Sequence, residues 1–318
     1  MRAEDLTPDQ RIPALPLDAL PLDALPLDAL PLDALPLDAA ALCRAVVRPG
    51  GLWRAVEVTA VTDSTNADLL ARAAGGAPEG LVLAAEEQRA GRGRMGRAWV
   101  APPRAALTFS LLVRPRTVPP ARRGWLPLLA GVAVASAVHA VASVDARLKW
   151  PNDVLVGPAK LGGILAEAAG DAVVVGIGLN VSTEPGELPP PGPAPTGALP
   201  ATSLRAQADG TPADGTPPAG SLAAGSLDRE SLLTGILAGF ERRYQAWVQA
   251  GGDPERCGLR AEYTGLCATI GRRVRAELPG GQLLSGLAAG VDPDGRLVVR
   301  VSPDSEVPVA AGDVVHLR

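Results

Sequence analysis

The stretch from Trp125 to Val144 contains no Asp, Glu, Lys or Arg, and it limits what this chain can fold into more than any other feature. An apolar segment of this length either crosses a lipid bilayer or lies inside a protein core. Pro127, His139 and two serines interrupt it, which argues against a membrane span. We therefore expect a buried helix rich in Ala and Val, in a protein that has no contact with a membrane.

The composition is that of a globular protein. Apolar residues make up 47% of the 318 residues and charged residues 20%, so the chain can bury a core. Only 5 Trp, 2 Tyr and 2 Phe are present, so Val, Leu and Ala must fill most of that core. The length fits two domains, or one large domain with a small one.

Charge and cysteine content exclude several function classes. The formal net charge is −4 with a pI near 5.4, which opposes binding of nucleic acid by bulk electrostatics, so any anion site must be local. The three cysteines and two histidines have neither disulfide-framework nor zinc-ligand spacing, so we assign no metal ligand. The N-terminus lacks the pattern of a signal peptide. These features predict a cytoplasmic protein.

Two segments are expected to lack regular structure. The five-residue unit ALPLD repeats through residues 14–39, and proline at every fifth position removes amide donors that a helix or sheet needs. Residues 1–40 are therefore predicted to form a disordered tail that leaves no room for a helix-turn-helix. Residues 183–227 are rich in Pro, Gly, Ala and Ser, and we predict an insertion without fixed structure.

The remaining segments predict an α+β fold. Residues 41–270 should form a domain with one mixed β-sheet and helices packed on it. Residues 271–318 contain short strands between Gly- and Pro-rich turns and should form a small β-barrel docked on the main domain. The expected helices are Thr65–Ala74, Trp125–Val144 and Arg229–Ala250. The expected strands of the main domain are Val56–Val61, Leu81–Glu86, Ala106–Arg114, Val154–Val156, Leu161–Ala168 and Ala172–Asn180.

The strongest chemical signal is the segment Gly91–Arg97, which reads GRGRMGR and is followed by Trp99. Its three glycines let the backbone approach a ligand closely, and its three arginines offer planar charged groups to carboxylate or phosphate oxygens. It is neither a Walker A loop nor a dinucleotide-binding GxGxxG turn. Arginine–glycine runs also occur in disordered RNA-binding segments, but this one lies between two expected strands. We interpret it as an anion-binding loop.

A second cluster, Lys149–Asp153, follows the apolar helix and reads KWPND. Pro151 stiffens this turn, so Lys149 and Asp153 should be held at its two ends. The lysine could neutralise phosphate or carboxylate, and the aspartate could pair with magnesium or an amine. A lysine and an aspartate around a turn are more often a solvated surface, and it is the arginine loop that favours a site here.

Two further clusters allow two interpretations each. The residues Asp63–Asn66 precede an expected helix, where they could simply cap it or could bind a polar ring or an anion. Gly162, Gly163, Gly176 and Gly178 lie in expected strands, where glycine marks close approach of a ligand or tight strand packing. The local pattern leaves both choices open.

Taken together, five motifs resemble one family, the biotin–protein ligases. They read DSTN, GRGRMGRAW, KWPNDVLV, KLGGILAE and VGIGLNV, and they follow the family's order between Asp63 and Val181. The resemblance implies a seven-stranded mixed sheet, a small C-terminal capping domain, and biotin, ATP and Mg²⁺ as ligands. Lipoate and octanoate transferases share the sheet, but the complete arginine loop and the KWPND turn favour biotin.

The resemblance also implies roles for single residues. The implied site consists of Ser64, Thr65, Asn66, Gln88, Arg92, Gly93, Arg94, Arg97, Lys149 and Asn180. The first four would surround the ureido ring of biotin, the loop Arg92–Arg94 would close over biotin and its adenylate, and Asn180 would lie near the adenylate. Met95 stands where some relatives have arginine, and we assign it no contact. We expect the catalytic residues to be Lys149, Arg94 and Asp153.

The implied reaction explains the residue types. The carboxylate of biotin would attack the α-phosphorus of ATP, and arginine, lysine and magnesium would offset the charge of the two anions. The product, biotinyl-5′-AMP, would then be attacked by a lysine of a biotin carboxyl carrier domain, with Asp153 as candidate base. Longer family members repress transcription through an N-terminal helix-turn-helix, but here the proline repeat occupies that place. We therefore expect no DNA binding, and a homodimer remains open.

Overall fold

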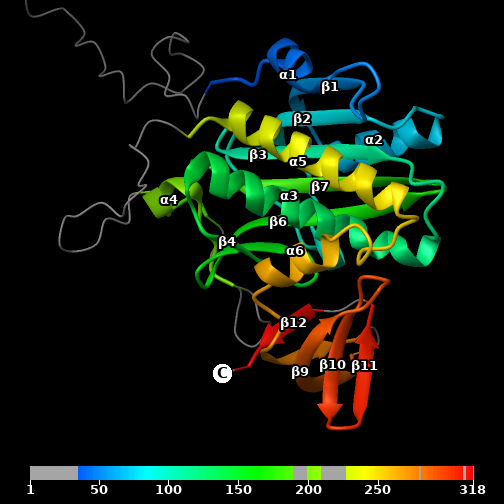
Figure 1. Cartoon of the computed structure of the whole chain (residues 1–318). Coiled ribbons are helices and arrows are strands. Elements are labelled where there is room, and N and C mark those ends of the chain that lie inside the picture. The colour runs from blue at the N-terminus through cyan, green and yellow to red at the C-terminus, as the bar shows by residue number, and fades with distance from the viewer. Residues whose placement is uncertain (1–34, 189–198, 209–226, 279–280, 311–312, 318) are drawn as a thin grey trace, which may run out of the picture.

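Two β-sheets form the framework of the molecule (Figure 1). One is a seven-stranded mixed sheet with helices on both faces, and the other is a five-stranded antiparallel sheet near the C-terminus. This arrangement confirms the predicted α+β class with a small C-terminal β-domain. The computed structural model describes residues 35–188, 199–208, 227–278, 281–310 and 313–317.

The large sheet has the order β1-β2-β3-β7-β6-β5-β4, and only the pair β1–β2 is parallel. A parallel pair needs a crossover, and helix α2 supplies it. Strand β4 could not be predicted from the sequence, because its four residues ARLK are too few to establish a pattern. The strands are β1 (Ala55–Thr62), β2 (Leu81–Gln88), β3 (Ala106–Val113), β4 (Ala146–Lys149), β5 (Asp153–Val156), β6 (Ala159–Ala169) and β7 (Ala172–Asn180).

The helices cover both faces of this sheet. Helices α3 and α5 lie across one face, and α2 packs on the opposite face (Figure 1). Helix α1 packs against β1, and α6 contacts α3 and β4. The bounds are α1 (Ala39–Val46), α2 (Thr65–Ala74), α3 (Trp125–Ala142), α4 (Leu204–Ala208), α5 (Arg229–Gln249) and α6 (Leu259–Leu266), with short 3₁₀ turns η6 (Arg94–Gly96) and η7 (Pro120–Gly124).

Helix α3 is the buried helix that the apolar stretch predicts. It lies between the sheet and α5, so nearly all of its circumference is covered by protein. Within the described residues, the segment Pro120–Ala142 is the one helix long and apolar enough to cross a membrane, and most of it is buried in this fold. Packing on both sides therefore explains why it has no polar stripe.

Strand β7 shows how the sheet divides its two faces. Its odd-numbered residues, such as Val175 and Ile177, face the large core beneath α3 and α5. On the other face, Ala172 and Val174 belong to a smaller cluster with α2. The next positions on that face are glycines and an asparagine, because side chains alternate along a strand. The apolar cluster therefore ends where these residues begin.

The C-terminal sheet has the order β11-β10-β9-β8-β12. Its buried residues, among them Val274 and Leu297, belong to the same apolar cluster as the main core, so the two sheets are packed together. Its strands are β8 (Arg273–Glu277), β9 (Leu283–Val291), β10 (Leu297–Ser302), β11 (Ser305–Val309) and β12 (Asp313–His316).

The end of the proline repeat is folded, so the predicted boundary of the tail is wrong. Residues 1–34 lie outside the described residues, but Leu37 is buried and Asp38 caps α1 by accepting hydrogen bonds from two amides of its first turn. The Leu37 amide donates to Glu86 Oε1 at 2.7 Å, and the Arg229 guanidinium contacts the carbonyl of Leu35. Tertiary contacts, which a local pattern cannot show, fix this segment.

The predicted insertion is also partly wrong. Residues 189–198 and 209–226 lie outside the described residues, whereas residues 199–208 have a defined structure that includes α4. Thr202 and Ser203 are buried, and Ala201 forms a bridge with Lys160 of β6. A composition rich in small residues therefore conceals a segment that pairs with the main sheet.

Candidate active site

A cavity of about 260 Å³ opens on the α2 face of the large sheet, where the apolar cluster of β7 ends. Its wall contains residues from each of the five motifs, which the fold brings together from distant parts of the chain. Every predicted site residue lines it: Ser64, Thr65, Asn66, Gln88, Arg92, Gly93, Arg94, Arg97, Lys149, Asp153 and Asn180.

The residues at the start of α2 serve both purposes that the sequence leaves open, capping of the helix and lining of the cavity. Ser64 is the N-cap, and its hydroxyl accepts a hydrogen bond from the Ala67 amide at 3.4 Å. Thr65 and Asn66 are buried and point toward the sheet instead. Ser64 therefore caps the helix and also lines the cavity, whereas Thr65 and Asn66 line the cavity without capping.

Thr65, Asn66 and their neighbours form a buried hydrogen-bond network. The Thr65 hydroxyl lies 3.0 Å from Gln88 Oε1 and 2.7 Å from the Ser110 hydroxyl. Ser110 donates to Asn66 Oδ1 at 2.6 Å, and Asn66 Nδ2 donates to Glu167 Oε2 at 2.7 Å. This network fixes the orientation of the Asn66 amide at one end of the cavity. Sequence reasoning missed Ser110, because a serine inside a strand carries no motif signal.

Two strand glycines leave room for side chains of the site. A Cβ atom at Gly176 would overlap the Asn66 amide, and one at Gly178 would overlap the indole of Trp99. At these two positions, glycine serves neither close approach of a ligand nor packing of strands. The sheet lacks side chains there so that residues of the cavity wall can lie against it.

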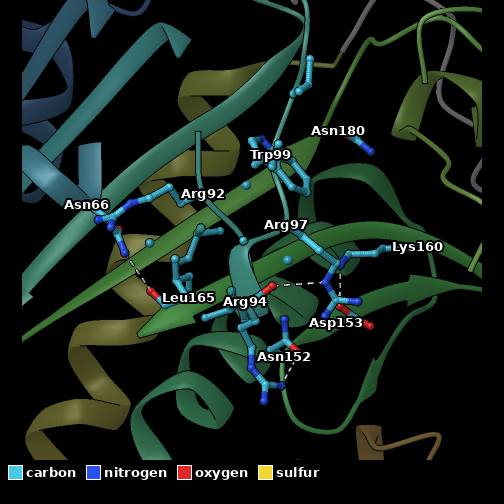
Figure 2. Close-up of a pocket in the computed structure, with 18 of the residues that line it drawn as sticks. Asn66, Arg92, Arg94, Arg97, Trp99, Asn152, Asp153, Lys160, Leu165 and Asn180 are labelled. Carbon is cyan, nitrogen blue, oxygen red and sulfur yellow. Dashed lines mark hydrogen bonds and ion pairs between the residues drawn. The ribbon is translucent and has the colours of Figure 1, made fainter. Parts of the chain in front are cut away.

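The arginine loop crosses the cavity between β2 and β3 (Figure 2). Arg92 Nη2 lies 3.2 Å from Glu167 Oε2, so the loop is tied to the Asn66 network. Arg94 Nη1 donates to Asn152 Oδ1 at 3.0 Å, and the Arg97 Nε donates to the Arg94 carbonyl at 3.2 Å. The loop therefore reaches both ends of the cavity.

Met95 lies in the middle of this loop and is exposed. Its φ of 55° is in the left-handed region, its side chain is 67% exposed, and it does not line the cavity.

Lys149 and Asp153 meet across a hairpin, as the KWPND turn predicts. They are register partners at the ends of β4 and β5, and Lys149 Nζ lies 3.4 Å from Asp153 Oδ2. Lys160 of β6 lies closer, with its Nζ 2.6 Å from Asp153 Oδ1. Sequence reasoning did not assign Lys160, because only the hairpin of β5 and β6 brings it beside the turn. Figure 2 shows Lys160 and Asp153 on the opposite side of the loop from Asn66.

The two lysines change the chemistry expected of Asp153. Burial raises the pKa of its carboxyl group, but the ammonium groups of Lys160 and Lys149 outweigh this effect, and the pKa is lowered overall. A carboxylate with a lowered pKa accepts protons poorly. The geometry thus argues against the predicted base role and favours a carboxylate that holds two cations in place.

Asn180 lies at the end of β7, where it meets residues 199–202, a structured part of the predicted insertion. Its Nδ2 donates to the Thr202 carbonyl at 2.9 Å. The Lys160 amide donates to the Pro200 carbonyl at 2.7 Å, and the Thr202 amide donates to the Lys160 carbonyl at 2.8 Å. Leu199 and Ala201 consequently form part of the cavity wall.

The cavity unites a polar, hydrogen-bonded end with a cationic end, beneath a loop that carries three arginines. Two family models match the chain: the Biotin/lipoate A/B protein ligase family over residues 58–183, and the Biotin protein ligase C terminal domain over residues 269–317. The first covers most of the large sheet and of the cavity wall, and the second covers the C-terminal sheet.

Relatives that match most of the chain identify the family more specifically. The chain is 44% identical over 277 residues to the biotin–[acetyl-CoA-carboxylase] ligase of Mycobacterium tuberculosis, covering 86% of this chain and 93% of that protein. It is 32% identical over 231 residues to the bifunctional ligase/repressor BirA of Bacillus subtilis, covering 71% of this chain and 63% of that protein. The chain belongs to the biotin–protein ligase family and is an enzyme, as the motifs predict.

Solved structures agree on the fold. The biotin protein ligase of Aquifex aeolicus in complex with biotin and ATP superposes with a TM-score of 0.61 at 23% identity, covering 83% of this chain and 98% of that one. The biotin protein ligase of Leishmania major in complex with biotinyl-5-AMP gives a TM-score of 0.52 at 24% identity, covering 85% and 100%.

Proposed function

We propose that this enzyme activates biotin with ATP to form biotinyl-5′-AMP and transfers the biotinyl group to a lysine of a biotin carboxyl carrier domain of the acetyl-CoA carboxylase type. The observation that carries the proposal is the polarity of the cavity, which has neutral hydrogen-bonding groups at one end and two lysines at the other. Biotin has the matching polarity, with a neutral ureido ring and a carboxylate at the end of an alkyl chain.

The polar end would bind the ureido ring. Thr65, Asn66 and Gln88 offer both donors and acceptors, and the network with Ser110 holds them in fixed orientations. The indole N–H of Trp99 is buried and has no hydrogen-bond acceptor within the described part of the chain. A bound ligand could supply that acceptor, because an unpaired buried donor is unfavourable.

The cationic end would bring two anions together. Lys149 and Lys160 flank Asp153, and Arg94 is held beside them through Asn152. The carboxylate of biotin must approach the α-phosphate of ATP, and fixed positive charges would stabilise the charge that develops as pyrophosphate leaves. Asp153 would orient the lysines for this step rather than accept a proton.

The nucleotide would lie toward Asn180 and the segment 199–202, which form the wall beyond Lys160. Mg²⁺ would neutralise phosphate charge when it arrives with ATP. Among the described residues, no three His, Cys, Asp or Glu side chains gather to hold a metal ion, and both oxygens of Asp153 contact lysines. A resident magnesium site therefore does not fit these residues, and we assign no step to it.

The arginine loop would protect the intermediate. Biotinyl-5′-AMP is a mixed anhydride that water hydrolyses, and a loop that crosses the cavity excludes water from it. The carrier lysine would then attack the acyl carbon, with AMP as the leaving group.

ATP–pyrophosphate exchange with purified protein, run beside lipoate and octanoate, tests this proposal. We expect exchange that requires biotin and falls at least about 100-fold in Lys149→Ala, because a fixed cation at the reacting centre is lost. Mass spectrometry of a carrier domain should then show one biotinyl group on a lysine. Exchange with lipoate or octanoate alone would overturn the choice of substrate, and exchange without carrier labelling would overturn the transfer step.

A further inference from the structure

We propose that Thr269 is a positioning residue, whose hydroxyl sets the turn between Lys149 and Asp153 and so makes the C-terminal domain a working part of the active site. The inference rests on the proposed function only for its kinetic test. It comes from contacts that join the C-terminal part of the chain to the backbone beside Lys149.

The hydroxyl of Thr269 lies between the two parts of the molecule. Thr269 is fully buried, and its Oγ1 accepts a hydrogen bond from the Trp150 amide at 3.1 Å. The same oxygen lies 3.0 Å from Nε2 of His316 on β12. A hydroxyl oxygen has two lone pairs and one proton, so Thr269 accepts from the Trp150 amide with either tautomer of His316. One hydroxyl thus links the turn to β12.

The turn is held by further bonds from the same side. Trp150 is 1% exposed, and its indole N–H donates to the Gly295 carbonyl, in the β9–β10 loop, at 3.0 Å. The Ala268 amide donates to the Leu148 carbonyl at 2.7 Å, one residue before Lys149. Val314, two residues before His316 on β12, lines the cavity itself. Residues beyond α6 therefore contact Leu148 and Trp150, on either side of Lys149, and also contribute to the cavity wall.

A small displacement here would reach the reacting groups. Lys149 and Asp153 stand at the two ends of the turn, and their side chains meet at 3.4 Å. Trp150 follows Lys149 directly, so a shift of its amide moves the lysine backbone. Misplacement of a catalytic group by about 1 Å can lower a rate about 100-fold.

A matched set of variants in the full chain tests the proposal. Thr269→Val removes the hydroxyl and keeps the shape, Thr269→Ser keeps the hydroxyl, and Thr264→Val makes the same change on the exposed surface of α6. We expect Thr269→Val to lower kcat of biotin-dependent exchange at least about 10-fold, with KM for biotin changed less than about twofold. Thr269→Ser and Thr264→Val should stay within about twofold of the wild type.

Trp150→Phe provides a second variant in case Thr269→Val does not fold. It removes the N–H that bonds the Gly295 carbonyl, together with one ring of the buried indole, and kcat should again fall more than KM rises. Equal kcat in Thr269→Val and the wild type would overturn the proposal, and so would equal losses in Thr269→Val and Thr269→Ser.

A crystal structure of Thr269→Val separates this proposal from the proposed function, because it needs no activity. We expect the Lys149–Asp153 contact to lengthen. An unchanged turn would overturn the positioning role, whereas a wild-type enzyme without biotin-dependent exchange would overturn the proposed function alone.

Discussion

Asp153 organises the charges at one end of the cavity. Each of its oxygens contacts a different lysine, and its side chain is only 15% exposed. Its pKa is lowered, so it is ionised throughout the neutral range and compensates one of the two positive charges. Without it, Lys149 and Lys160 would repel each other in a largely buried site.

Asp153→Asn should therefore impair both half-reactions. We expect kcat of biotin-dependent exchange to fall about 100-fold, because the two lysines lose their common partner and their positions. The rate of transfer from preformed biotinyl-5′-AMP should fall as well. Stopped-flow and exchange assays measure the two steps separately. A loss confined to transfer would instead restore the base role for this residue.

The glycines beneath the cavity wall lead to a second prediction about single residues. Gly178→Ala would place a methyl group where the Trp99 indole lies, so the loop must move outward. We expect KM for biotin to rise about 10-fold or more with little change in melting temperature, since the strand itself is not strained. Gly290→Ala in β9 is the control, because a Cβ there meets no atom within 4 Å. Equal KM values in the two variants would contradict this account of Gly178.

Among the elements, those with a strong local pattern could be predicted from the sequence. The long apolar stretch locates α3, apolar periodicity locates α5, and the serine before Thr65 marks the start of α2. Helix α1 and residues 199–208 could not be found this way, because their contacts come from distant segments. The site shows the same division. Lys149 could be predicted from its turn, whereas Ser110 and Lys160, the latter at the start of the motif KLGGILAE, join the site only through strand pairing.

A buried ion pair between Arg229 and Glu86 holds the segment that leads into α1. Arg229 at the start of α5 is 1% exposed, and its Nη1 lies 2.7 Å from Glu86 Oε2 on β2. Arg229→Met should lower the free energy of unfolding by about 3 kcal/mol, because Glu86 is left buried without its partner. The double variant with Glu86→Gln should recover part of that loss.

Urea denaturation measures these values, and Arg300→Met offers the control. Arg300 forms an exposed ion pair with Glu306, so its removal should cost less than about 1 kcal/mol. Similar losses at the two arginines would show that the Arg229 pair does not anchor the segment.

For the whole molecule, the C-terminal sheet and the large sheet share one apolar core, so they should unfold together. His316 lies at their junction and gives this unit a pH dependence. Burial lowers the pKa of His316 to about 4, with Lys149 and Arg272 adding to the effect. The folded protein therefore keeps this imidazole neutral down to a lower pH than the unfolded chain does.

Proton binding decides whether the free energy of unfolding rises or falls with pH. Between about pH 6.5 and pH 4 the unfolded chain binds a proton at His316 that the folded protein does not, so the free energy of unfolding falls as the pH falls. Because the side chain is partly exposed, we expect a loss on the order of 2 kcal/mol. Urea denaturation at several pH values should show a shallower slope in His316→Gln, whereas His139→Gln on the exposed end of α3 should keep the slope. A slope that is the same in all three proteins would contradict this assignment.

The placement of the tryptophans also gives the molecule an optical property. Trp53, Trp125, Trp150 and Trp247 are each at most 1% exposed, whereas Trp99 lines the cavity. Ligands that enter the cavity meet the Trp99 indole directly, and the other four rings supply a nearly constant emission. Intrinsic fluorescence should therefore act as a built-in reporter of occupancy, with no label required.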